Sequence, residues 1–184
     1  MSDEFLGERR RVLEDSFFAQ RDRELMEKLK QQLKKDELSS ACGIKNPAVI
    51  ESLVNANISS ETITALTLVP LIAVAWADGE IAPEERDAIR SAIEATGIEA
   101  DSICRQLLDT WLAEPPGPEL VKAWKDYIRA LASTASPAAV ETLRDDVLNH
   151  TREIAAAAGG ILGLRSISKN EKDVIDDLLS AFPE

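Results

Sequence analysis

The stretch that decides the fold of this chain runs Ala73-Val-Ala-Trp-Ala-Asp-Gly-Glu-Ile-Ala-Pro-Glu-Glu-Arg-Asp-Ala-Ile89. Its first residues are apolar, an acidic turn follows at Asp78-Gly79, and Pro83 opens a second, amphipathic segment. Glycine takes backbone conformations that other residues avoid, and proline is favoured in the first turn of a helix. The stretch therefore predicts two helices joined by a tight acidic turn.

The last part of this stretch is repeated 86 residues further along the chain. Ile81-Ala-Pro-Glu-Glu-Arg-Asp-Ala-Ile89 aligns with Ile167-Ser-Lys-Asn-Glu-Lys-Asp-Val-Ile175. The two segments share both terminal isoleucines, one glutamate, one aspartate and a basic residue between these two acids. Such an internal repeat predicts two helical halves related by approximate pseudo-symmetry.

Composition favours helices over strands along the whole chain. Hydrophobic residues make up 45% of the 184 positions, but only 4% are aromatic, and alanine and leucine are plentiful. No segment alternates apolar and polar residues as a strand would. We therefore expect an all-α protein, a compact bundle of eight or nine helices preceded by a long amphipathic N-terminal helix. Residues 1–43 would form this arm and residues 44–184 the body.

Start and stop signals place the individual helices. Asn46-Pro47 and Pro83 are start signals, Ser168-Lys-Asn-Glu171 is a capping box, and Gly43 ends a helix. Pro70 falls inside an apolar segment and is expected to kink its helix. The predicted helices cover approximately residues 8–35, 36–42, 47–56, 60–77, 83–97, 100–112 and 119–131, then a long helix from 137 into the stretch 155–160, and a last one over 168–182.

Two features of the sequence indicate how these helices pack. The three tryptophans fall at apolar positions of predicted helices, which makes Trp76, Trp111 and Trp124 candidate core anchors. The small residues from Ala155 to Gly160, together with Gly163, permit close approach of two backbones. We therefore expect the helix that ends there to lie near the centre of the bundle.

The N-terminal segment from Glu8 to Lys35 contains no proline or glycine and is dense in charges of both signs. Its apolar residues recur mostly at helical spacing; they are Leu13, Phe17, Phe18, Leu25, Leu29 and Leu33. We expect one nearly continuous helix in which Phe17, Phe18, Leu25 and Leu29 are buried. Two alternatives remain for the surface that buries them. It is either the body of the same chain or another chain, including a second copy.

The net charge of −12 lies entirely outside the arm. Residues 1–36 carry nine acidic and nine basic side chains, whereas the rest of the chain carries 24 acidic and 12 basic ones. An acidic body repels phosphate backbones, so nucleic acids and anionic membrane surfaces are poor partners, and basic proteins or divalent cations suit it better. The N-terminus lacks an apolar signal segment and the longest apolar run, residues 65–77, is too short to span a bilayer. We expect a cytoplasmic protein without membrane insertion.

Few residues are available for catalysis. His150 is the only histidine, and Cys42 and Cys104 stand alone without the spacing of metal ligands. The sequence contains no nucleophile–base pair, no phosphate-binding glycine loop and no cofactor fingerprint. We therefore expect no enzymatic activity and no resident cofactor, with a weakly bound divalent cation as the one alternative.

The acidic turn is the stretch where such a cation would bind. Asp78-Gly-Glu-Ile-Ala-Pro-Glu-Glu85 matches the second half of an EF-hand loop. The first half is missing, because Val74 and Trp76 stand where side-chain oxygen ligands would be needed, and this excludes a standard calcium loop. Two interpretations stay open, a helix-capping turn or a weak Ca²⁺ or Mg²⁺ site formed by Asp78, Glu80 and Glu85.

The pattern Ala77-Asp-Gly-Glu-Ile-Ala-Pro-Glu-Glu-Arg86, followed by Ile89 and Ile93, resembles the signature of TerB-like domains. These domains occur in tellurite-resistance proteins and in the N-terminal region of the membrane co-chaperone DjlA. The segment from Ile167 to Ile175 resembles the partner half of that signature. The resemblance covers about residues 59–182, within the body.

The resemblance implies an all-helical domain with pseudo-symmetric halves that acts without catalysis, in metal-related stress or in envelope-associated complexes. It also implies a metal site at the acidic turn, which would fall on Asp78, Glu80 and Glu85. The chain departs from the pattern in two places. Leu164-Arg165 stand in the second half where Asp78-Gly79 stand in the first, and the arm lies outside the domain.

The sequence thus favours an acidic helical module that binds other proteins, with the arm available for a homo-oligomer. This interpretation explains the uneven charge and requires no missing residue. A weak divalent-metal sensor or buffer that uses the acidic turn is the alternative, and an enzyme is the second alternative.

Overall fold

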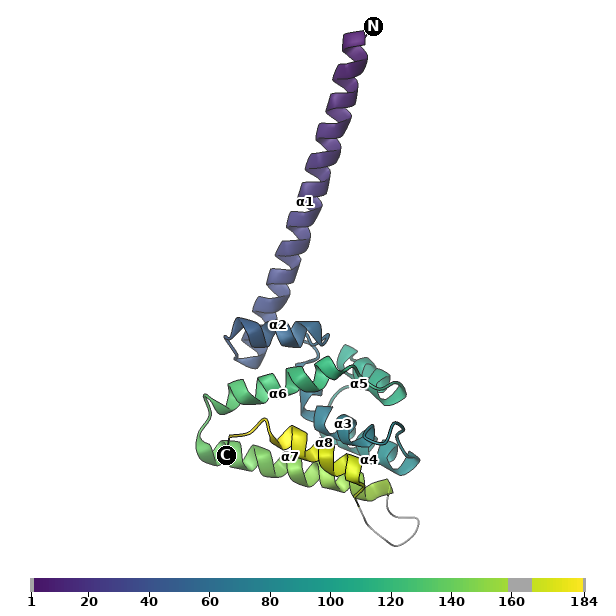
Figure 1. Ribbon diagram of the computed structural model, residues 1–184, viewed down its shortest axis with the longest axis vertical. Coiled ribbons are helices and arrows are strands. Elements are labelled where there is room, and N and C mark those ends of the chain that lie inside the picture. Colours follow the sequence, from purple (N-terminus) through teal and green to yellow (C-terminus); the bar gives the residue numbers. More distant parts are fainter. Residues whose placement is uncertain (1, 159–166, 184) are drawn as a thin grey trace.

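The computed structural model describes residues 2–158 and 167–183, with side chains described for residues 20–157 and 167–183. All regular structure in these residues is helical, and none of them lies in a strand (Figure 1). The elements are α1 (Ser2–Cys42), α2 (Pro47–Asn55), the 3-10 helix η1 (Ile63–Leu68), α3 (Val69–Ala75), α4 (Pro83–Ala95), α5 (Ile103–Ala113), α6 (Pro118–Ala132), α7 (Pro137–Ala158) and α8 (Lys169–Leu179). The predicted compact all-α fold is confirmed for this part of the chain. None of the helices within it has the length and hydropathy that a membrane crossing requires.

Local sequence signals set the helix ends where they were predicted. Asn46 Oδ1 accepts a hydrogen bond from Ala48 N at 3.0 Å at the start of α2. Ser168 Oγ accepts one from Glu171 N at 3.2 Å at the start of α8. Both bonds satisfy a backbone N–H that the first helical turn leaves without a partner. Gly43 follows the end of α1 with a φ of 71°, a conformation that glycine adopts without strain.

The region predicted as one kinked helix over residues 60–77 folds differently. The 3-10 helix η1 ends at Leu68, α3 begins at Val69, and Pro70 lies in the first turn of α3. A proline in a first turn removes an N–H that has no partner in the helix, so Pro70 starts a helix instead of kinking one. Residues 36–42, predicted as a separate short helix, continue α1 because no glycine or proline lies between residue 8 and Gly43.

Helix α3 lies at the centre of the body. Six of its seven residues are buried, and it packs against η1, α4, α6, α7 and α8 (Figure 1). Helix α7, predicted near the centre, contacts α3, α4 and α8 with one side and exposes many residues on the other. That prediction is wrong, because α3 is the shorter and more apolar helix and fills the centre instead. Gly160 and Gly163, on which it partly depended, lie outside the described residues.

Two of the three tryptophans anchor the core as predicted. Trp124 is 2% exposed and packs edge-on against Phe182, with ring centroids 6.3 Å apart, and Trp111 is also buried. Truncation of a buried aromatic side chain of this size to alanine lowers the free energy of unfolding by about 3–5 kcal/mol. Trp76 is half-buried and its indole N–H donates to the Trp111 carbonyl at 2.8 Å.

Helix α1 is attached to the body through its C-terminal turns. Leu38 is fully buried, and Lys35 Nζ lies 3.6 Å from Glu51 Oε1 on α2. Every side chain from residue 20 to residue 34 is exposed. In Figure 1 the helix accordingly projects away from the other elements.

The exposure of α1 decides one of the two alternatives left open for the arm. Leu25 and Leu29 are 57% and 51% exposed, so the prediction that they are buried is wrong for the single chain. Residues 20–34 are all exposed, so they do not pack along the described part of their own body. Phe17 and Phe18, predicted to be buried with them, lie outside the described side chains.

Candidate functional site

The turn between α3 and α4 shapes one wall of a pocket. Gly79 has a φ of 89°, and its N–H donates to the Trp76 carbonyl at 3.0 Å. A Cβ at this position would meet no other atom within 4 Å, so glycine is favoured there by backbone conformation alone. Ile81 then enters the core with 8% exposure, and Pro83 begins α4. The turn therefore places its flanking carboxylates around this wall of the pocket.

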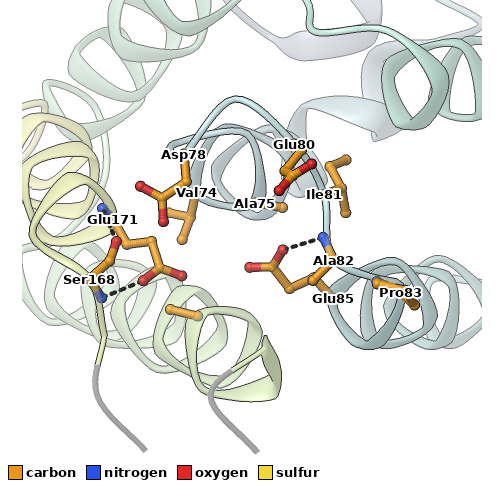
Figure 2. Close-up of a pocket in the computed structure, with 11 residues that line it drawn as sticks. Val74, Ala75, Asp78, Glu80, Ile81, Ala82, Pro83, Glu85, Ser168 and Glu171 are labelled. Atoms are coloured by element: carbon orange, nitrogen blue, oxygen red, sulfur yellow. Dashed lines mark hydrogen bonds between the residues drawn. The ribbon is translucent and has the colours of Figure 1, made fainter. Parts of the chain in front are cut away.

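A pocket of about 460 Å³ lies between this turn, α7 and the start of α8 (Figure 2). Four carboxylates line it. Asp78, Glu80 and Glu85 come from the turn and from the first turn of α4, and Glu171 comes from α8. Apart from Ser168, the other lining residues are small or apolar. The structure thus brings the three predicted site residues to one pocket and adds a fourth acid.

Glu85 and Glu171 occupy equivalent positions at the starts of α4 and α8. Glu85 Oε2 accepts a hydrogen bond from Ala82 N at 2.8 Å, and Glu171 Oε2 accepts one from Ser168 N at 2.5 Å. Both residues are buried, with 4% and 6% exposure. At α8 the capping is reciprocal through the Ser168 hydroxyl, whereas Ala82 has no hydroxyl and only the glutamate half forms. Figure 2 shows the two carboxylates pointing toward one another across the pocket.

Burial changes the ionisation of Glu85. Desolvation raises the pKa of its carboxyl above the ordinary value, because surroundings of low polarity disfavour the charged form. The Ala82 N–H opposes this shift, while the negative charges of Glu171, Asp78 and Glu84 add to it. The net direction is upward, so Glu85 takes up a proton more readily in the folded protein than in the unfolded chain.

The other two predicted ligands are held at the rim. Asp78 Oδ1 accepts a hydrogen bond from Asn170 Nδ2 at 2.7 Å, which ties the turn to α8, and Glu80 is exposed. Within residues 2–158 and 167–183, no three His, Cys, Asp or Glu side chains converge closely enough to hold one metal ion. Asp78, Glu85 and Glu171 each already accept a hydrogen bond through one oxygen. As these residues stand they form no ready cation cage, and the metal site stays a prediction.

Glu171 is the pocket residue that the sequence analysis did not assign to the site. The signal was present, because the repeat aligns Glu171 with Glu85. The repeat was interpreted only as evidence for the fold, whereas it also marks two capping carboxylates that face one pocket. Leu164-Arg165, the counterpart of Asp78-Gly79 in the repeat, lie outside the described residues.

A second candidate surface lies on α1. Four of the five large hydrophobic residues that the described part of the chain exposes are on this helix. At about 100° per residue they fall within an arc of about 100° on one side of it. We call them the arm face: Leu25 (57% exposed), Met26 (56%), Leu29 (51%) and Leu33 (61%). Contiguous exposed apolar patches of this kind mark interaction sites.

Comparison of the chain with protein-family models, with curated proteins and with solved structures finds no match. The resemblance to TerB-like domains therefore stays a prediction. The acidic pocket and the arm face are the two features of the described residues that bear on function.

Proposed function

We propose that this protein is a non-enzymatic, acidic helical module that binds other proteins through the arm face. The observation that carries the proposal is the exposure of four neighbouring large apolar residues on a helix that leaves the body. A helical segment without tertiary contacts is only marginally stable in water. A protein surface that covers the arm face would stabilise α1 and remove its apolar side chains from solvent.

Basic residues border the arm face on both sides and indicate the chemistry of the partner. Arg21 and Lys28, seven residues apart, lie along one edge, and Arg23 and Lys30 lie along the other. An amphipathic surface with acidic borders complements such a face. The basic partner expected from the net charge of −12 would instead contact the body.

The proposal is compatible with what the TerB-like resemblance implies, a cytoplasmic module in metal-related or envelope-associated stress complexes. The equivalent capping bonds of Glu85 and Glu171 support the pseudo-symmetry of the two halves. In each copy of the repeat, the glutamate in the first helical turn accepts a hydrogen bond from the backbone N–H of the residue three positions before it.

Two matched double variants test the proposal. Leu25→Ser with Leu29→Ser removes apolar groups from the arm face, while Gln20→Ser with Gln31→Ser changes two exposed residues on the opposite side of α1. Burying one leucine contributes about 1.5–3 kcal/mol, so we expect the arm-face variant to co-purify its protein partner at least about tenfold less than wild type. The opposite-side variant should recover wild-type amounts. Equal recovery by all three proteins would contradict the proposal.

A weak divalent-cation site in the acidic pocket is the second candidate function. It is favoured by the four carboxylates that line one pocket, Asp78, Glu80, Glu85 and Glu171, since carboxylate oxygens are preferred ligands of Ca²⁺ and Mg²⁺. The carboxylates would have to turn from their present hydrogen-bond donors, so we expect dissociation constants no tighter than about 10⁻⁴–10⁻³ M.

Titration calorimetry with CaCl₂ and MgCl₂ tests this second candidate. The control is the double variant Asp78→Asn with Glu85→Gln, which retains the shapes of the side chains. Heat and a thermal shift in the wild type that the variant abolishes would support the site. Absence of heat at millimolar cation would leave the turn as a capping device.

A further inference from the structure

The charge distribution along α1 indicates what covers the arm face. Residues 2–18 contain five acidic and three basic residues, whereas residues 20–36 contain four acidic and six basic ones. The two halves of the helix therefore carry net charges of −2 and +2. The basic half is also the half that presents the arm face. In two antiparallel copies of the helix, the net charge of each half is therefore opposite to that of the half beside it.

We propose that the arm face is covered by α1 of a second copy of the chain in antiparallel orientation. Residues 20–36 of one helix would lie against residues 2–18 of the other, and a twofold axis would pass near residue 19. This inference rests on the proposed function and names its partner. Because the interface is isologous, the acidic half meets the basic half at both ends of the pair.

A parallel pair is disfavoured by the charges on the bodies. It would place like-charged halves of α1 together and bring two bodies, which together carry all the excess negative charge, side by side. At about 1.5 Å per residue the 41-residue helix is about 60 Å long. An antiparallel pair separates the bodies by a distance well beyond the screening length of about 8 Å at physiological ionic strength.

Pairing of residues 20–36 with the same residues of the second copy is disfavoured as well. The borders of the arm face are basic on both sides, through Arg21 and Lys28 on one and Arg23 and Lys30 on the other. In either direction such a pairing sets basic borders against basic borders. The acidic half of α1 offers the opposite charge along a stretch of helix of matching length.

Sedimentation equilibrium of the full chain tests whether a second copy binds. We expect the mass of two chains for the wild type and for Gln20→Ser with Gln31→Ser. We expect the mass of one chain for Leu25→Ser with Leu29→Ser, with an unchanged melting temperature because these side chains lie outside the body. A wild type that remains one chain at about 0.1 mM would overturn the second copy as partner. Co-purification of a different protein through the arm face would still support the proposed function.

A distance between spin labels tests the orientation. The label is attached at Gln31→Cys, on the side of α1 opposite the arm face, in a chain with Cys42→Ala, and Cys104 is left in place because it is buried. With the axis at residue 19, the two labelled positions are separated by about 36 Å along the helices and about 20 Å across them, so the labels lie about 40 Å apart. A separation of about 20–25 Å would indicate parallel pairing or pairing of like halves and would overturn the proposal. So would a broad distribution without the component at about 40 Å, as expected if the arm face binds the acidic body of another copy.

Discussion

Replacing Glu85 separates two roles of one buried carboxylate, its hydrogen bond to Ala82 N and its negative charge beside Glu171. Glu85→Gln keeps an acceptor oxygen at the same reach and removes the charge, whereas Glu85→Ala removes both. Glu84→Gln is the matched control, because Glu84 is the exposed neighbour in the same helical turn.

The hydrogen bond sets the magnitude of the first effect. Loss of a bond that caps a helix N-terminus costs about 0.5–2 kcal/mol. We therefore expect Glu85→Ala to be less stable than Glu85→Gln by at least that amount at pH 7. The exposed control should stay within about 0.5 kcal/mol of wild type.

The raised pKa of Glu85 sets the sign of the second effect. A carboxyl whose pKa is higher in the folded protein than its ordinary value of 4.5 binds its proton more tightly when folded. The stability that this proton contributes is fully present below pH 4.5 and is lost as the pH rises through the folded pKa. Glu85→Gln stays neutral throughout. The free energy of unfolding of Glu85→Gln, compared with that of wild type, should therefore be higher at pH 7 than at pH 4.5.

Urea denaturation of the four proteins at the two pH values measures both effects. A difference between Glu85→Gln and wild type that does not change with pH would refute the argument from burial and charge. Equal stability of Glu85→Gln and Glu85→Ala would refute the role of the capping bond.

Three further substitutions test the fold through the same denaturation curves. Trp124→Ala should lower the free energy of unfolding by about 3–5 kcal/mol, because Trp124 is buried against Phe182, and a loss below about 1 kcal/mol would contradict this packing. Gly79→Ala should cost about 1 kcal/mol through backbone strain alone, since its φ is 89° and a Cβ meets no atom; no loss would show that the turn adapts. Asn46→Ala should cost about 0.5–2 kcal/mol, while Asn46→Asp retains the acceptor for Ala48 N and should remain close to wild type.

Helix starts were predictable because residues close in the sequence determine them. The start signals act on backbone groups within three or four positions of themselves, as Asn46, Pro83 and Ser168 do. Both the signal and the backbone group on which it acts can therefore be read from one short stretch of sequence. Pro70 was misinterpreted because its local rule allows a kink or a helix start. The choice depends on residues 63–68, which form η1 and contact α5, a distant segment.

The candidate sites were predictable in part for the same reason. The acidic turn groups Asp78, Glu80 and Glu85 by proximity in the sequence, and they do line one pocket. The burial of Glu85 and the opposing carboxylate of Glu171 depend on how distant helices pack, which no local pattern encodes. Likewise, periodicity predicted an apolar face on α1 but could not tell whether the body reaches it.

Photo-cross-linking from α1 in cells that produce the protein tests the central claim most directly, namely that the arm face binds protein. A photoreactive phenylalanine analogue replaces Met26 on the arm face in one sample and Gln31 on the opposite side in the other. The account predicts protein adducts from position 26, at the mass of two chains if a second copy is the partner, and few or none from position 31. Equal yields from the two positions, or no adduct from position 26, would contradict it.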